Sequence, residues 1–582
     1  MEKVDLVVIG TGFNGLAAAK TYLELNPEAK VVVLEAGASV GGVWSKERLY
    51  KGLKSNNLLG TYEFSDFPMD PATFGVKPGE HIPGEILHAY LAEYAEHFGF
   101  TEKIRLNSKV ETVTHQEDGT WKLTVENSAA SLITRKLIVA TGLTSQPYLP
   151  DFQGQDTFQT PLFHCRDLPK FEKDLLQDGK RATVFGGSKS AWDAVYSCAT
   201  SGLQVDWVIR ESGHGPIWMA PPYVTPLKKW LEKLVTTRFL TWFSPCIWGD
   251  ADGYGFVRSL LHGTWIGRKI VDAFWAILGQ DVVQLNGYDK HPQTQKLKPW
   301  VSAFWIATSF SILNYPTDFF EYVRNGTVRI HIADITHLTS NTVHLSTDEE
   351  LPTDALICST GWKCQPAVKF LPEGIEHDLG LPWSEDTLDQ QLVKDADDEI
   401  LHRFPRLRDQ PTINNKYKPL SNASDVFVPH PFRLTRFMIP PSLISERSIA
   451  FVGMTTTFDT ALVAQTQALW ATAYLDNKLS VVANAHQPTN AESFAKDDPS
   501  EITDIQWETA LHTQFCKWRY PGGYGKRYPD FVFDAIPYID LLLNDLGLPN
   551  HRKKGQLAEI FDPYGPEDYR GLTQEWQAAA NK

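Results

Sequence analysis

A glycine-rich turn near the N-terminus constrains the fold of this 582-residue chain more than any other feature. The apolar run VDLVVI at 4–9 predicts a buried strand, and Gly10-Thr11-Gly12-Phe13-Asn14-Gly15 leads from it into a predicted helix, LAAAKTYLEL. Gly10 permits the tight turn, Gly12 lets the backbone approach a pyrophosphate, and Gly15 lets the helix pack on the strand. A second strand ends at Glu35, about 20 residues further on, so the order predicts a dinucleotide site with its phosphates at the helix N-terminus.

The acid at Glu35 indicates which dinucleotide this first site prefers. A carboxylate there accepts hydrogen bonds from a ribose 2′-OH and repels a 2′-phosphate, which favours FAD or NAD over NADP. The segment Gly41-Gly42-Val43-Trp44 follows closely. Gly42 would let the chain pass near an extended diphosphate, and Trp44 would shield a flavin, so FAD is the expected cofactor. The alternative is a glycine-rich turn in an unrelated α/β domain.

A second motif of the same kind lies in the middle of the chain. A strand at 182–185 is followed by Gly186-Gly187-Ser188-Lys189-Ser190-Ala191, a helix, and a strand that ends at Arg210. Ser188 replaces the second glycine of the motif, but its small hydroxyl can still donate a hydrogen bond. We expect this second dinucleotide to contact Gly186, Ser188, Lys189 and Ser190. Arg210 can hold a 2′-phosphate, which favours NADPH; a solvated arginine and an ordinary helix N-terminus are the alternatives.

Further motifs resemble the two-dinucleotide-domain flavoprotein monooxygenases, the superfamily of flavin-containing and Baeyer–Villiger monooxygenases. The likeness is greatest to fungal members of secondary-metabolite pathways, some of which are associated with epoxidation. Ala140-Thr141-Gly142 resembles the crossover from the FAD domain to the NADPH domain, and 354–361, with Thr360 and Gly361, resembles the return. The resemblance implies that these five named residues contact a cofactor. The strand at 449–453 resembles the one that brings a glycine, here Gly453, near the flavin ring. The resemblance also implies that Val110 contacts FAD.

Two residues are catalytic candidates through this resemblance. Ser55-Asn56 resembles the segment that places an asparagine beside the flavin, where Asn56 would hydrogen-bond the oxygen adduct or a substrate oxygen. The linker fingerprint FxGxxxH appears as 158–164, with Thr160 in place of the glycine. His164 would couple domain movement to reduction; a purely structural linker histidine is the alternative. The Thr160 departure separates the chain from standard members of either named subfamily.

The resemblance implies the reaction. NADPH reduces FAD, the reduced flavin and O2 form a C4a-(hydro)peroxyflavin, and one oxygen atom passes to a small apolar organic substrate. Epoxidation, oxidation at nitrogen or sulfur, and Baeyer–Villiger oxidation stay open. An NADPH-dependent flavin reductase or oxidase is the first alternative, and a non-catalytic binding protein on a flavoprotein fold is the second. No residue spacing predicts a metal site.

The expected fold class is α/β, with two Rossmann-like domains and a helical C-terminal extension. The FAD domain is predicted at 1–150 and 351–480, the NADPH domain at 151–350, and a helical cap at 481–582. An aromatic insertion at 213–310 would form a lid, a substrate wall or a packing subdomain, and its segment 218–243 is expected to be a loop followed by an amphipathic helix. The acidic stretch 370–410 is expected to be surface loop, and the polar stretch after 485 a linker.

Composition bounds the partners and the compartment. A net charge of −15 gives nucleic-acid binding no electrostatic support. The six cysteines form no CxxC pair, which argues against a dithiol reductase and predicts reduced thiols in the cytoplasm. We find no signal peptide and no uninterrupted apolar run of about 18 residues, so no membrane span is expected. A peripheral membrane contact within 235–280 stays open, and the oligomeric state is not predicted.

Overall fold

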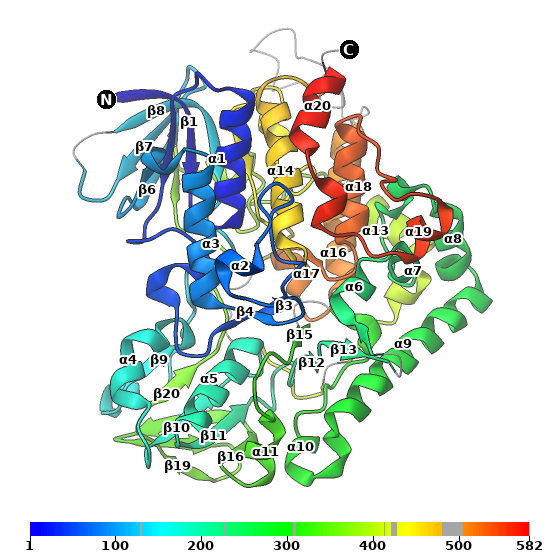
Figure 1. Cartoon of the computed structure of the whole chain (residues 1–582). Coiled ribbons are helices and arrows are strands. Elements are labelled where there is room, and N and C mark those ends of the chain that lie inside the picture. The colour runs from blue at the N-terminus through cyan, green and yellow to red at the C-terminus, as the bar shows by residue number, and fades with distance from the viewer. Residues whose placement is uncertain are drawn as a thin grey trace.

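The chain folds around two largely parallel sheets, one above the other in Figure 1. This computed structural model describes residues 1–128, 131–225, 228–306, 310–412, 414–420, 428–479 and 504–580. The upper sheet carries the first glycine motif, and the lower sheet carries the second. Helices of the insertion and of the C-terminal region lie to the right of the two sheets in Figure 1. The mixed α/β class with two Rossmann-like sheets is therefore confirmed.

The upper sheet is built around the N-terminal strand β1 (Glu2–Ile9). It pairs in parallel with β2 (Val31–Leu34) and with β8 (Leu132–Val139). The eight strands follow the order β21-β6-β7-β8-β1-β2-β5, with β22 (Ile449–Phe451) beside β8. The remaining strands are β5 (Ile104–Arg105), β6 (Val110–His115), β7 (Trp121–Val125) and β21 (Lys369–Leu371). The buried helices α1 (Phe13–Leu25) and α14 (Thr460–Leu475) pack on each other beside this sheet.

The lower sheet has five parallel strands in the order β16-β11-β10-β20-β9. They are β9 (Leu162–His164), β10 (Arg181–Phe185), β11 (Gln204–Ile209), β16 (Val328–Ile332) and β20 (Leu356–Cys358). The helix α5 (Lys189–Thr200) connects β10 to β11, as the second motif predicts. The chain returns to the upper sheet only after Cys358, because β20 still pairs with β10, so the sheet boundary lies later than position 351. The domain division itself stays a prediction.

Part of the insertion differs from the expected loop and single amphipathic helix. Residues 218–243 contain the short strands β12 (Trp218–Ala220), β13 (Tyr223–Val224) and β14 (Lys229–Trp230), and then two helices, α6 (Leu231–Val235) and α7 (Arg238–Thr241). The helix breaks because Thr237 adopts an extended backbone and its Oγ1 accepts a hydrogen bond from the Leu240 N–H. Such a threonine starts a new helix rather than continuing the old one. The prediction of one helix is therefore wrong.

The acidic stretch 370–410 is not a loop, which corrects a second expectation. It contains α12 (Ile375–Asp378) and the 14-residue helix α13 (Gln390–Arg403). Asp389 caps α13 by accepting hydrogen bonds from two backbone N–H groups, and Leu392, Ala396 and Ile400 are buried on one face. These apolar residues recur every four positions, which is a helical period that the acidic outer face conceals. That inner face packs against α16 (Asp504–Arg519).

The C-terminal region is the predicted helical cap, with one addition. Its helices α16, α18 (Ala535–Asp545), α19 (Gln556–Phe561) and α20 (Leu572–Ala580) lie beside α14 and the insertion (Figure 1). The addition is a two-residue strand, β24 (Asp530–Phe531), which pairs in parallel with β23 (Thr456–Thr457). The predicted linker after 485 lies outside the described residues.

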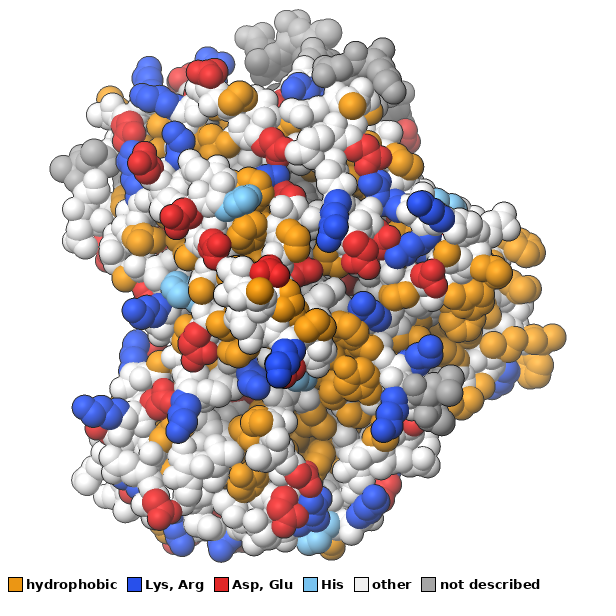
Figure 2. All heavy atoms as spheres, in the orientation of Figure 1, with side chains coloured by type: hydrophobic (Ala, Val, Ile, Leu, Met, Phe, Trp, Pro, Cys, Tyr) orange, Lys and Arg blue, Asp and Glu red, His pale blue; other side chains and the backbone are white. Residues whose placement is uncertain are grey.

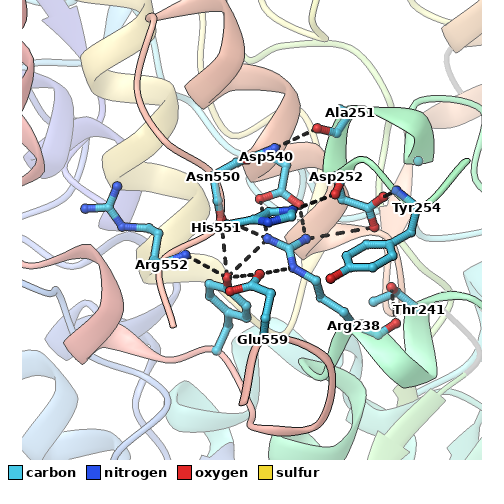
Figure 3. A network of polar contacts seen from close by, with 12 residues as sticks. Arg238, Thr241, Ala251, Asp252, Tyr254, Asp540, Asn550, His551, Arg552 and Glu559 are labelled. Carbon is cyan, nitrogen blue, oxygen red and sulfur yellow. Dashed lines mark hydrogen bonds and ion pairs between the residues drawn. The ribbon is translucent and has the colours of Figure 1, made fainter. Parts of the chain in front are cut away.

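A buried ionic network joins the insertion to this cap. Arg238, on α7, points between Asp540 and Glu559 in Figure 3. Its guanidinium also donates to the Asn550 carbonyl and to the Tyr564 hydroxyl oxygen. Four acceptors from the cap thus surround one cation from the insertion, which fixes the two regions against each other.

Candidate functional site

A cavity of 1260 Å³ opens at the carboxyl ends of the strands in the upper sheet. This edge is where open α/β sheets bind their ligands, since strand ends and helix N-termini face outward there. The cavity lining includes nine residues that the sequence predicts to contact FAD. They are Gly10, Gly12, Glu35, Gly42, Val110, Ala140, Thr141, Gly142 and Gly453.

The glycines of this cavity meet the demands of a close-packed turn. Gly10 has φ +107°, and a Cβ there would lie 2.4 Å from the Ala140 carbonyl oxygen. A Cβ at Gly15 would lie 2.0 Å from the Gly10 carbonyl oxygen. Gly15 therefore allows the helix to pack closely on the turn, and it does not line the cavity. Gly12 is different, because a Cβ there would meet only Gly42 Cα, at 3.8 Å, and would stand at the cavity surface. The cradle therefore fits a diphosphate.

Glu35 stands at the end of β2, as predicted, and the turn holds its carboxylate in place. Oε2 accepts from the Thr11 N–H at 3.0 Å and from the Thr11 hydroxyl at 2.6 Å, and Oε1 accepts from the Gly37 N–H at 2.8 Å. Arg48, which the sequence argument does not single out, also lines the cavity. Burial lowers the pKa of this guanidinium to about 10, which leaves it charged at pH 7. The lining of this cavity thus contains a carboxylate that is fixed in place and a cation; that Glu35 binds the ribose of FAD stays a prediction.

The second motif is packed in the same way as the first. Gly186 has φ +133°, and a Cβ there would lie 2.3 Å from the Ser359 carbonyl oxygen. The Ser188 hydroxyl lies 2.7 Å from the Ser359 hydroxyl, and the Ser190 hydroxyl interacts with the Cys165 thiol. Arg210 follows β11 directly. The roles of these residues in holding a second dinucleotide stay predictions.

The side chains of Arg210 and Lys189 already have protein partners. Arg210 Nη2 donates to the Ser212 hydroxyl and to the Lys418 carbonyl, each at 2.8 Å, and Nε lies 3.5 Å from Asp334 Oδ1. Lys189 Nζ binds Asp193 and, at 3.0 Å, Asn314 Oδ1. Lys189 also lines a second cavity, described below.

The two predicted crossovers lie side by side. The Tyr148 N–H donates to the Gly361 carbonyl at 3.0 Å, and the Thr360 hydroxyl donates to the Tyr148 carbonyl at 2.6 Å. The outgoing chain after Gly142 and the returning chain after β20 are therefore hydrogen-bonded where they pass between the sheets. Thr360 and Gly361 therefore lie in the crossover between the two sheets and are not in the lining of the FAD cavity, so their predicted contact with a cofactor stays a prediction.

A second cavity, of 350 Å³, adjoins the first. Tyr62, Thr456, Thr457 and Thr460 line both, so one wall is common to them. Trp44 is buried and its indole N–H lies 3.3 Å from the Tyr62 hydroxyl. Further lining comes from Asn56, Lys189, Phe310, Phe458 and Asp530. We call this space the side cavity.

The two catalytic candidates occupy different places. Asn56 lies on β3 (Lys54–Leu58), lines the side cavity, and accepts a hydrogen bond on Oδ1 from the Ser311 hydroxyl at 3.0 Å. His164 ends β9 and lines neither cavity. Its ring packs edge-on against Trp362, with 4.8 Å between centroids, and Nδ1 accepts from the Arg166 N–H. Burial lowers the pKa of His164 to about 4, which keeps the ring neutral at pH 7.

Sequence reasoning missed the part of the site that the C-terminal cap supplies. Asp530 and Val532 line the side cavity, although the glycine motifs give no reason to bring this region to the flavin site. The signal that could have drawn attention to Asp530 is an acid within the aromatic segment RYPDFVF. Among the described residues no group of histidine, cysteine and acidic side chains could hold a metal ion.

Comparison with known proteins agrees with this geometry. Residues 7–240 match the pyridine nucleotide-disulphide oxidoreductase family. A FAD-dependent monooxygenase of Aspergillus sclerotiorum is 36% identical, over 99% of this chain and 98% of the relative. One from Pyrenophora dematioidea is 35% identical, over 95% of this chain and 100% of the relative. The closed crystal structure of cyclohexanone monooxygenase covers 100% of this chain and 98% of its own, with a TM-score of 0.57 at 14% identity, and so shows a shared fold.

Two Rossmann-like sheets joined by paired crossovers, with an FAD-sized cradle beside a smaller cavity, define a flavoprotein oxidoreductase. The near-complete alignment with fungal relatives narrows this class. The chain belongs to the family of FAD-dependent monooxygenases. As a monooxygenase it takes O2 and an organic substrate.

Proposed function

We propose that this enzyme uses NADPH to oxygenate a small, largely apolar molecule bound in the side cavity, as a step of secondary-metabolite biosynthesis. The observation that carries the proposal is the wall that the side cavity shares with the FAD cavity. A molecule in the side cavity would lie next to whatever the FAD cavity holds. Trp44, Phe310 and Phe458 give it apolar walls, which suits a substrate with little polar surface.

In this proposal the protein positions the substrate and excludes water from the site, rather than supplying acid–base groups. Bound FAD, reduced by NADPH, supplies the activated oxygen. In our proposal the aromatic walls exclude water from the reacting atoms, and the Asn56 amide donates a hydrogen bond to an oxygen in the cavity. The Ser311 hydroxyl orients that amide through Oδ1. Arg210 would hold the 2′-phosphate of NADPH, and this contact would make the second site prefer NADPH to NADH.

The test is oxygenation of a small panel under ¹⁸O2. Cyclohexanone, thioanisole and styrene would report ester formation, sulfur oxidation and epoxidation respectively. We expect a yellow protein that forms one of these products with a single ¹⁸O atom. NADPH consumption recovered entirely as H2O2 would support the reductase or oxidase alternative, and a colourless protein would support the binding protein. Asn56→Ala should raise the share of NADPH lost as H2O2, whereas Asn544→Ala, on the surface of the cap, should not.

We also propose a location for the enzyme, the cytoplasm, with a peripheral contact to membranes. All six cysteines are free and buried, which suits a reducing compartment. Within the described parts of the chain, no helix has the length and apolar character to cross a membrane. The membrane contact rests on a different feature, the surface of the insertion.

Large apolar side chains gather on one flank of the molecule, on the right in Figure 2. The flank is formed by α8 (Gly255–Arg258), the π-helical segment Ser259–Gly263, α9 (Trp265–Asn286) and α19. Its exposed residues are Phe256, Leu260, Trp265, Ile266, Ile270, Ile277, Leu285, Leu557 and Phe561. Trp265 is 68% exposed and Ile277 is 72% exposed, which is costly in water. Lys269 is the only exposed charged residue on α9, and its positive charge would suit a bilayer that contains anionic lipid.

Flotation with vesicles tests the membrane contact. We expect the protein to float with phosphatidylcholine–phosphatidylserine vesicles, and the double variant Ile270→Glu, Ile277→Glu to lose most of that binding. Leu149→Glu, which changes an exposed leucine outside the flank, is the matched control. Failure of the native protein to float would overturn the proposed membrane contact. A stable dimer that the double variant converts to a monomer would also overturn it, because the flank would then bind a second copy of this chain.

A further inference from the structure

Asp530 is an acidic residue of the side cavity that no motif accounts for. It begins β24, opposite Thr456 in the paired strand β23, and only 3% of the residue is exposed. Asp530 is one of the residues that line the cavity. Oδ2 is buried and has no hydrogen-bond partner in the part of the chain that the structure describes. A buried oxygen without a partner is costly, and the cavity beside it offers the place where a bound molecule could satisfy it.

The surroundings of Asp530 raise the pKa of its carboxyl, so that it is largely neutral at pH 6 and about half neutral at pH 7. Burial raises its pKa to about 7, and the nearby charge of Asp534 acts in the same direction. Arg519 and the Thr456 hydroxyl oppose the shift. Arg519, however, donates to the Phe304 carbonyl and to the Ser244 hydroxyl, so its guanidinium is directed elsewhere.

The other charged side chains of the cavity also leave Asp530 without a counter-ion. Two lysines are in the lining, Lys54 and Lys189, and Asp193 pairs with Lys189. Neither lysine contributes to the shift in the pKa of Asp530. Asp534 is occupied by the Tyr520 hydroxyl at 2.6 Å. A protonated carboxyl is a hydrogen-bond donor, whereas a carboxylate can only accept. In its neutral form Asp530 can therefore donate a hydrogen bond to a molecule in the cavity.

Two other buried carboxyls near the site show that the placement of Asp530 is distinctive. Burial also raises the pKa of Glu232 and Asp459 to about 7 each. Glu232, however, accepts hydrogen bonds from the Leu58 N–H at 2.9 Å and the Trp230 indole at 2.8 Å, and so is a structural group. Asp459 lines neither cavity. Asp530 alone among these three combines a neutral carboxyl with a place on the cavity wall.

We propose that Asp530 is a substrate-binding acid, which donates a hydrogen bond from Oδ2 to an oxygen atom of the molecule in the side cavity. The substrate is then an apolar molecule that carries a carbonyl, hydroxyl or ether oxygen. Asp530 and Asn56 would hold polar groups of this molecule from two elements of the cavity, while the aromatic walls hold its apolar part. The inference rests on the proposed function, since it places the substrate in the side cavity.

Carbodiimide labelling of the holoenzyme tests the state and access of this carboxyl without knowledge of the substrate. N,N′-diisopropylcarbodiimide is small and apolar, and a protonated carboxyl adds across its C=N bond to give, after rearrangement, a stable N-acylurea. Peptide mass spectrometry should find the label on Asp530 at pH 6, with less labelling as the pH rises through about 7. Asp459 is the matched control and should stay unlabelled, because it has a similarly raised pKa but does not line the cavity. No label on Asp530, or equal labelling of both residues, would overturn the inference.

Protection by two probe molecules tests the class of ligand. Cyclohexanone carries an oxygen acceptor, and cyclohexane has nearly the same shape without one. At matched concentration, we expect cyclohexanone to slow the labelling of Asp530 at least threefold and cyclohexane to leave it unchanged. Equal protection by both, or by neither, would contradict the hydrogen bond to a substrate oxygen. Flavin content and oxygenation of the panel are measured separately, so a labelled Asp530 in a protein that makes no oxygenated product would count against the proposed function alone.

Discussion

Arg238 Nη1 lies 2.5 Å from Asp540 Oδ2, and both side chains are completely buried although 302 positions separate them. The pair links α7 of the insertion to α18 of the C-terminal cap (Figure 3). Glu559 binds the same guanidinium through Nε. Because the cap also delivers Asp530 to the side cavity, this ionic contact helps to hold the substrate wall in place.

Replacing Arg238 by methionine should destabilise the protein by about 3–5 kcal/mol, because two buried carboxylates lose their counter-ion. Urea unfolding followed by tryptophan fluorescence would measure the loss. Arg324→Met is the matched control, since Arg324 pairs with Asp318 and Glu321 on the surface, where such pairs contribute about 1 kcal/mol or less. Equal midpoints for the two variants would show that the buried network does not stabilise the fold.

Gly12→Ala should lower the FAD content of the purified enzyme while the apoprotein stays folded. The new Cβ has room in the chain itself, where its nearest neighbour is Gly42 Cα at 3.8 Å, but it occupies the surface that the diphosphate needs. Gly15→Ala is the contrasting variant, because its Cβ would lie 2.0 Å from the Gly10 carbonyl oxygen and must disturb the turn. Flavin absorbance per protein and circular dichroism separate the two effects. Full FAD occupancy in Gly12→Ala would remove this residue from the cofactor site.

The parts of the fold that the sequence predicts are those fixed by local chemistry. The turn requires Gly10 and Gly15 because neighbouring backbone carbonyls leave no room for a side chain at either position, and this requirement is visible in the sequence. The same holds for the strand that ends at Glu35. Such motifs carry their geometry within about 30 residues, so they can be identified without knowing what packs around them.

The parts that could not be predicted depend on contacts between distant segments. Asp530 reaches the side cavity only because β24 pairs with β23, more than 70 positions away in the chain. The helix α13 hides its buried face of Leu392, Ala396 and Ile400 among acidic residues, so the stretch is read as a polar loop. In both cases the deciding partner, β23 or α16, cannot be identified from the local sequence.

The stability difference between the native protein and Asp459→Asn should change in favour of the variant as the pH rises from 5 to 7. Burial raises the pKa of Asp459 from 3.8 to about 7, so its contribution is fully present below pH 3.8 and lost as the pH rises through about 7. Between these values the folded state binds one proton more than the unfolded chain, which costs about 1.4 kcal/mol for each pH unit. Urea unfolding of the native protein and the variant at pH 5, 6 and 7 would measure the difference in their free energies of unfolding. A constant difference between the variant and the native protein at all three pH values would contradict the assignment.

Arg210→Ala should raise the KM for NADPH about tenfold to a hundredfold while the KM for NADH changes little. A guanidinium that holds a 2′-phosphate makes charge-assisted hydrogen bonds, each worth about 1.5–3 kcal/mol, and NADH has no phosphate to lose. The present partners of Arg210, Ser212 and Asp334, would keep the loop after β11 folded around the shorter side chain. Steady-state rates of NADPH and NADH oxidation measure the change, with Arg181→Ala, an exposed arginine at the start of β10, as control. An equal rise for both nucleotides would mean that Arg210 shapes the site without reading the 2′-phosphate, and the preference for NADPH would then have to come from another residue.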